Sequence, residues 1–305
     1  MSDIMFADKV QLFDASDGDV NNISPFDGEQ LPDFAFEAYG VRIHLSADND
    51  ELLEIGIRTA KKALVGRLKE IECSGRDADH RFSVHRDSNR GYYFRDEGEP
   101  TTPTPDETDF CRLLNTMIRI QVAAKAKRYV FIHSGVVAVN GRAIVLPGDS
   151  YAGKTRLVAE LIRRGAVYFS DEYAVLDEYG KVHPFERNLS MRPDGGHIPY
   201  EVEPEDLGAV RGKIPVPAGM LVLTKFEPGS IWKPEQISLG QAILEMVPKA
   251  IGVRNNPEFY LTVLNTTFKS ATILKSLRSE AAETAERILE AFYKLPVSKD
   301  SGCIF

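Results

Sequence analysis

The sequence predicts an α/β protein with a mixed β-sheet over residues 106–305, preceded by a smaller α+β segment over residues 1–105. Strand-like apolar runs alternate with helix-like periodic segments after residue 106. Asn140-Gly141 separates two such runs, and this dipeptide is the strongest short signal for a β-hairpin. The second run then continues through a glycine-containing loop into an amphipathic helix.

The elements of the first segment are short. Residues 1–33 are rich in Asp, Asn and Gly and are expected to be loosely attached. Alternating apolar residues predict a strand or hairpin over 34–45, and short strands are predicted over 81–85 and 92–94. A helix is predicted over 50–68, because its apolar residues fall near one helix face. Three prolines and several threonines within 97–107 predict a linker, so the domain boundary is placed between residues 105 and 106.

The second segment begins with a helix that starts near Asp106 and ends near the basic residues 125–128, as the helix dipole favours. Strands are predicted over 129–139 and 142–146, then a helix that ends at Arg163-Arg164-Gly165. The remaining predictions are a strand over 166–170, a hairpin turning near 178–180, a strand over 219–225, and helices over 237–247 and 280–295.

The loop after residue 146 matches the phosphate-binding pattern G-x-x-x-x-G-K-[ST], with an apolar strand before it and a helix after it. Glycines allow the backbone to wrap a phosphate, and the helix N-terminus faces the anion. Lys154 is expected to reach the β- and γ-phosphates of a nucleoside triphosphate, and the Thr155 hydroxyl to bind Mg²⁺. The alternative is an ordinary glycine-containing turn. The residues assigned to the nucleotide are Gly148, Asp149, Ser150, Tyr151, Ala152, Gly153, Lys154 and Thr155.

A second pattern is the apolar run 167–170 followed by Asp171-Glu172, one helix after the loop. A strand there would carry a carboxylate to the phosphates, where it holds Mg²⁺ or accepts a proton from a substrate hydroxyl. The alternative is a solvated acidic turn.

Composition excludes several classes of protein. The net charge is −8 and no long Lys/Arg run occurs, so nucleic acid is not an expected partner. No apolar run reaches the roughly 18 residues of a membrane helix, and the acidic N-terminus does not have the pattern expected of a signal peptide. The three cysteines, Cys73, Cys111 and Cys303, form no C-x-x-C pair. Cys303 lies one residue too close to the end for a prenylation box. A cytoplasmic location is expected.

The stretch 132–176 resembles the catalytic domain of bacterial HPr kinase/phosphorylase in His133, the Asn140-Gly141 hairpin, the loop 148–155 and Ser170-Asp171-Glu172. The short gap between loop and acidic pair is the hallmark of that family. The resemblance implies a nucleotide-binding core similar to that of phosphoenolpyruvate carboxykinase, and transfer of phosphate from ATP to a serine hydroxyl. By position it makes Asp171 the general base and Thr155, Asp171 and Glu172 the metal ligands.

The same resemblance places His133 near the phosphates. A second signature of the family is similar to residues 189–193, where Arg192 matches the family's arginine. Ser190 stands where the family has an acid, and Glu186 is the candidate to replace that acid. Tyr151 and Arg156 also depart from the family's pattern, so HPr itself is not an expected substrate.

The predicted function is an ATP- and Mg²⁺-dependent kinase acting on a serine-type hydroxyl of a peptide, protein or small molecule, with a homo-oligomer left open. One alternative is a nucleotide-binding regulatory module without phosphotransfer, which Ser190 motivates. The other is a carboxykinase-like enzyme acting on a small acid, which ranks lower because the sequence pattern places no extra metal-binding His or Lys near the site.

Overall fold

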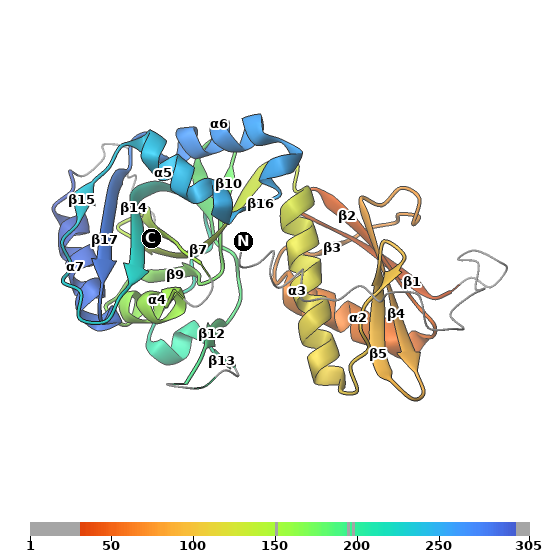
Figure 1. Cartoon of the computed structure of the whole chain (residues 1–305). Coiled ribbons are helices and arrows are strands. Elements are labelled where there is room, and N and C mark those ends of the chain that lie inside the picture. The colour runs from red at the N-terminus through yellow and green to blue at the C-terminus, as the bar shows by residue number, and fades with distance from the viewer. Residues whose placement is uncertain (1–30, 150–151, 194–195, 197–198, 297–305) are drawn as a thin grey trace. The chain divides into compact units, whose positions relative to one another are not determined.

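The computed structural model describes residues 31–149, 152–193, 196 and 199–296. They fall into two compact units, one within residues 2–127 and the other within 128–305, coloured red to yellow and green to blue in Figure 1. Each unit holds a mixed β-sheet and helices, so the chain is a mixed α/β protein. Most of the acidic stretch 1–33 lies outside the described residues, as do Cys303 and the C-terminal tail.

The first unit is a six-stranded sheet in the order β3-β1-β2-β4-β5-β6, in which only the β2–β4 pair is parallel. Helices α2 and α3 pack against each other, α2 against β2 and β4, and α3 against β5. The predicted helix over 50–68 is shorter, because it ends at Leu64 and Gly66 adopts a positive φ of 66°. Its elements are β1 Asp33–Ala38, β2 Val41–Ala47, α2 Asp50–Ala63, β3 Lys69–Glu70, β4 His80–Asp87, β5 Gly91–Asp96, β6 Glu99–Pro100 and α3 Glu107–Lys125.

Helix α3 begins where the sequence indicates, since the Asp106 side chain accepts hydrogen bonds from the backbone N–H groups of Thr108 and Asp109. The apolar face of this helix packs in the first unit, where Phe110 lies against Tyr92 and Phe94 of β5. The helix that the sequence analysis assigned to the second segment therefore lies with the first unit, and the chain leaves that unit after residue 127.

The second unit is built on a nine-stranded mixed sheet. Its main path is β11-β10-β7-β8-β14-β17-β15, and β9 and β16 also pair with β7. Strands β8, β14 and β17 run parallel, whereas β7 pairs antiparallel with β8, β9 and β10. The strands are β7 Tyr129–Val139, β8 Arg142–Pro147, β9 Val167–Ser170, β10 Tyr173–Asp177, β11 Lys181–His183, β14 Val216–Phe226, β15 Glu235–Gln236, β16 Ala250–Ile251 and β17 Thr272–Arg278, beside a separate ribbon of β12 Leu189–Met191 and β13 Tyr200–Val202.

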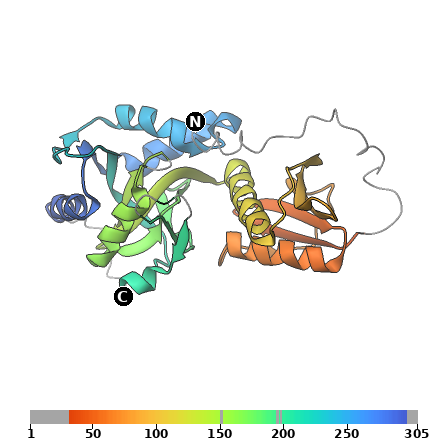
Figure 2. The ribbon, with the colours of Figure 1, turned by 60° about the horizontal axis from the view of Figure 1, so that its bottom comes forward.

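Helices cover both faces of this sheet (Figures 1 and 2). On one face, α4 and α7 pack together, and their apolar side chains form one core with Ile144 and Leu146 of β8. On the other face, α5 and α6 form a second core with Val145 of β8 and Leu221 of β14. Alternate residues of β8 thus enter opposite cores, as the strand period of two requires. The helices are α4 Lys154–Arg163, α5 Leu239–Met246, α6 Pro257–Phe268 and α7 Ala281–Tyr293, with short 3₁₀ helices η1 Pro204–Leu207, η2 Val247–Lys249 and η3 Val253–Asn255.

The predicted hairpin is present: β7 and β8 pair antiparallel around Asn140 and Gly141, whose φ angles are 50° and 69°. Positive φ at both turn positions matches the right-handed twist of the strands, which is why Asn-Gly is favoured there. The sequence analysis missed α6 and β17. Asn256 caps α6 and Pro257 opens it, so a helix-start signal was present.

Candidate functional site

The loop between β8 and α4 lies at the carboxyl end of β8. Gly153 is the N-cap of α4 in the left-handed conformation, with φ 74°, and no side chain caps this helix. The Lys154 ammonium donates hydrogen bonds to the carbonyl oxygens of Gly148 at 2.9 Å and Asp149 at 2.8 Å. Ser150 and Tyr151, which the sequence analysis assigned to the nucleotide, lie outside the described residues.

Strand β7 brings the second predicted group next to this loop. It pairs with β8 on one edge, where Ser134 is opposite Pro147, and with β9 on the other, where Val136 is opposite Ser170. Both strands therefore end beside the same part of β7. Asp171 follows Ser170 directly, so its carboxylate is delivered to the loop by strand pairing rather than by proximity in sequence.

The Asp171 carboxylate is buried, with 5% of the residue exposed, and accepts three hydrogen bonds. Oδ2 accepts from the Thr155 hydroxyl and from the backbone N–H of Ser190, each at 3.0 Å. Oδ1 accepts from the Tyr168 hydroxyl at 3.1 Å. The ribbon strand β12, the end of β9 and the start of α4 thus meet at one carboxylate.

The turn that follows β9 fixes this arrangement. The Ser170 hydroxyl oxygen accepts from the backbone N–H groups of Glu172 and Tyr173, each at 3.0 Å. Tyr168 is fully buried, and burial raises the pKa of its phenol well above 10, with the negative charge of Asp171 as the next contribution. The phenol therefore stays protonated and remains a donor to Asp171.

The other predicted residues lie nearby with different contacts. Glu172 forms an ion pair with Arg187, so its carboxylate is engaged away from Thr155. The backbone carbonyl of His133 accepts from the Gly148 N–H at 3.3 Å, and the His133 ring is 6.5 Å from the ring of Tyr173. The Arg192 carbonyl accepts from the Arg156 guanidinium at 3.5 Å.

Sequence reasoning missed one residue at this site. Arg278, the last residue of β17, donates from Nη2 to the Ala152 carbonyl at 2.7 Å. It is 126 residues away in the chain and is only 2% exposed. No local pattern marks a charged residue at the end of a strand as buried, so the sequence carried no signal for it.

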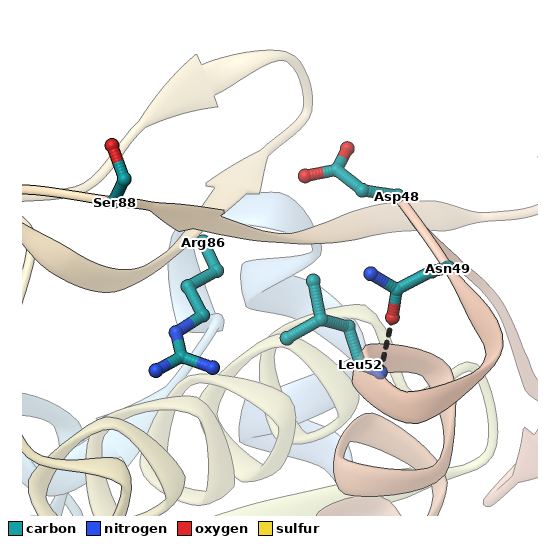
Figure 3. A pocket seen from close by; sticks show the side chains of 5 residues that line it. All are labelled: Asp48, Asn49, Leu52, Arg86 and Ser88. Carbon is teal, nitrogen blue, oxygen red and sulfur yellow. Dashed lines mark hydrogen bonds between the residues drawn. The ribbon is translucent and has the colours of Figure 1, made fainter.

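A surface hollow of about 460 Å³ lies in the first unit, lined by Asp48, Asn49, Leu52, Arg86 and Ser88 (Figure 3). Three of its polar residues, Asp48, Asn49 and Arg86, have local structural partners. Asn49 caps α2 by accepting from the Leu52 N–H, the dashed line in Figure 3, and Asp48 pairs with His85 at 2.7 Å. The guanidinium of Arg86 lies 4.9 Å from the centre of the Tyr92 ring. These three side chains are therefore engaged within the first unit.

Within the described residues, no helix is long and apolar enough to cross a membrane. The same part of the chain holds no group of three or more His, Cys, Asp or Glu residues arranged to bind a metal ion.

The fold and the site define a mixed α/β protein in which a strand–loop–helix turn faces a buried, hydrogen-bonded carboxylate. No family model matches the chain. It is similar to HPr kinase/phosphorylase of Mycoplasmopsis pulmonis, at 33% identity over 67 residues. The match covers 22% of this chain and 22% of that protein, so the chain matches about a fifth of the length of this curated relative.

Proposed function

We propose that the chain is an ATP-dependent phosphotransferase whose residues 148–155 form a P-loop within a domain similar to the HPr kinase core. The observation that carries the proposal is the contact between Thr155 at the start of α4 and the buried Asp171 carboxylate at the end of β9. A loop hydroxyl in contact with an acid on a neighbouring strand is the arrangement that phosphoryl-transfer sites of the P-loop type use. The partial similarity to a protein named HPr kinase/phosphorylase supports the same chemistry.

The phosphates of ATP would bind at the N-terminus of α4. Helix α4, like α7, carries no side-chain cap, whereas α2, α3, α5 and α6 do, so a bound anion would satisfy its first N–H groups. Lys154 would exchange its two loop carbonyls for phosphate oxygens. Its present contacts hold the ammonium group at the loop, so a small movement suffices.

The protein ligands fit Mg²⁺. This ion prefers oxygen ligands and is usually held by one or two protein groups together with substrate phosphates and water. Thr155 Oγ1 and Asp171 Oδ2 are 3.0 Å apart and supply two such oxygens. Bound there, Mg²⁺ would neutralise charge on the phosphates. Glu172 would join only if its ion pair with Arg187 opened.

Transfer to a serine-type hydroxyl of a peptide, protein or small molecule requires a group that accepts the hydroxyl proton. Asp171 is proposed for this role, because it is the buried carboxylate beside the loop. The burial and the Tyr168 hydrogen bond hold its side chain in one orientation, and positioning supplies much of the rate in phosphoryl transfer. His133 and Arg192 are proposed to lie near the phosphates.

A regulatory module that binds nucleotide without phosphotransfer is the second candidate. The observation that favours it is the saturation of the acidic groups, since Asp171 accepts three hydrogen bonds and Glu172 is paired with Arg187. Ser190, which stands where the resemblance expects an acid, contributes its backbone N–H rather than a carboxylate.

The test is incubation of the full chain with γ-labelled ATP, Mg²⁺ and cell extract. Lys154→Ala removes the phosphate-binding ammonium, and Lys294→Ala, an exposed lysine at the end of α7, is the matched control. The proposal expects label on an acceptor with the wild type and with K294A, and none with K154A. Label that is independent of Lys154, or ATP binding with no transfer to any acceptor, would contradict the kinase. The second outcome supports the regulatory module.

A further inference from the structure

Arg278 reaches the candidate phosphate loop from the far end of the chain. Strands β8, β14 and β17 are parallel, with Val145, Leu221 and Ile273 in one row, so the carboxyl ends of β8 and β17 lie at the same edge of the sheet. The loop leaves from β8 at this edge, and Arg278 ends β17 there. Two parallel strands with β14 between them therefore set the distance from Arg278 to the loop.

The guanidinium holds the last residues before α4. Nη2 donates to the Ala152 carbonyl at 2.7 Å, and a Cβ placed on Gly153 would lie 2.6 Å from the same nitrogen. Nη1 donates to the Ser279 carbonyl at 3.1 Å, and the guanidinium carbon lies 5.5 Å from the centre of the Phe226 ring. These contacts fix the orientation of the group against the backbone of the loop.

The charge of Arg278 is not compensated within the described part of the protein. Arg278 forms no ion pair there, its Nε has no hydrogen-bond partner, and 2% of the residue is exposed. Burial lowers its pKa, and Glu280 is the carboxylate whose charge acts against that shift. A buried, unpaired cation is unfavourable unless an anion accompanies it. Its place beside a helix N-terminus without a side-chain cap indicates where that anion would be.

We propose that Arg278 is a positioning residue for Ala152 and Gly153 at the N-terminus of α4, and that its charge stabilises a polyphosphate bound there. The inference rests on the proposed nucleotide site but is independent of phosphotransfer. Arginine suits this role because its planar fork can keep the Ala152 carbonyl while presenting another N–H to an anion. The backbone at Ala152 and Gly153 is thereby held in place before the ligand arrives.

The experiment measures the binding of tripolyphosphate and of Mg²⁺–ATP to the full chain by calorimetry at two salt concentrations. Arg278→Met and Arg278→Gln remove the charge, Arg278→Lys keeps it without the fork, and Arg287→Met changes an exposed arginine on α7 as the control. The neutral variants are expected to bind both ligands about tenfold or more weakly, the typical value of a charge-assisted contact, with a smaller salt dependence. R278K is expected to lose less binding affinity than the neutral variants, and R287M is expected to bind both ligands as the wild type does.

Thermal unfolding checks that each variant is folded. If R278M does not fold, the binding of R278Q provides the test of the charge. A neutral variant that binds tripolyphosphate as the wild type does would overturn the inference. R278K binding tripolyphosphate as weakly as R278Q would also overturn the inference, because the charge of residue 278 would then make no contribution to binding. A wild-type protein that binds no tripolyphosphate would overturn it as well. Failure of phosphotransfer with intact, Arg278-dependent binding would count against the kinase alone.

Discussion

Gly153→Ala tests the geometry of the loop most directly. Gly153 is left-handed, with φ 74° and ψ 23°, and an alanine there costs about 1–2 kcal/mol from backbone sterics. The added Cβ would also lie 2.6 Å from Arg278 Nη2, which is held by its hydrogen bond to Ala152. Displacing that bond from a charged donor costs roughly 1.5–3 kcal/mol more. The expected loss of unfolding free energy is about 2.5–5 kcal/mol.

Gly208 provides a matched control. Its φ of 78° and ψ of 14° are nearly the same, but no atom lies within 4 Å of a Cβ added there. Gly208→Ala should therefore lose only about 1–2 kcal/mol. Urea unfolding of both variants, followed by a probe in the second unit, measures the two free energies. Equal losses for G153A and G208A would refute the close packing of Arg278 against the loop.

Three further predictions concern the site and its surroundings. Asp171→Asn keeps the shape of the side chain but removes its charge, so ATP titrations should lose their Mg²⁺ dependence and label-transfer assays should show no phosphotransfer. The control Asp206→Asn, at an exposed position, should leave both properties unchanged. Equal behaviour of the two variants would contradict the role of Asp171. Burial raises the pKa of Tyr260 from 10.0 to about 12. Between these pH values the unfolded chain binds fewer protons than the folded chain, so the free energy of unfolding should fall as the pH rises from 10 to 12. Tyr260→Phe should flatten this pH dependence in urea unfolding, and an unchanged slope would contradict the role of Tyr260. Ser190→Glu places a carboxylate beside Asp171 and keeps the backbone N–H that donates to the Asp171 carboxylate. Titrations should therefore show tighter binding of Mg²⁺ to the ATP-loaded protein. Weaker binding would show that residue 190 does not face the metal.

Local chemistry made several elements predictable. The Asn140-Gly141 turn, the Asp106 cap of α3 and the strand–loop–helix around residue 148 depend on neighbours within a few residues, and all three elements are present. Strand β17 was not predicted, and neither was helix α6, although Tyr260, Val263, Leu264 and Phe268 repeat at helical spacing after the Asn256 cap. The loose attachment predicted for residues 1–33 falls mostly outside the described residues.

In the candidate site, too, some features follow from residues close together in the sequence and others depend on the tertiary structure. The order Lys154, Thr155 and Asp171 can be read from the sequence, and strand pairing through β7 brings Thr155 and Asp171 into contact. The ion pair of Glu172 with Arg187 could not be predicted, because it depends on the path of the chain after β11.

The sequence by itself determined a glycine-containing loop with Lys154 and Thr155, followed after one helix by the acidic pair Asp171-Glu172. These residues could be recognised because their types and their short spacing are visible in the chain itself. Only the tertiary structure decided which groups surround that loop. Arg278 becomes part of the site because β17 lies parallel to β14 and ends at the edge of the sheet where the loop begins. Contacts between residues far apart in the chain follow from sheet order, and a linear pattern carries no record of that order.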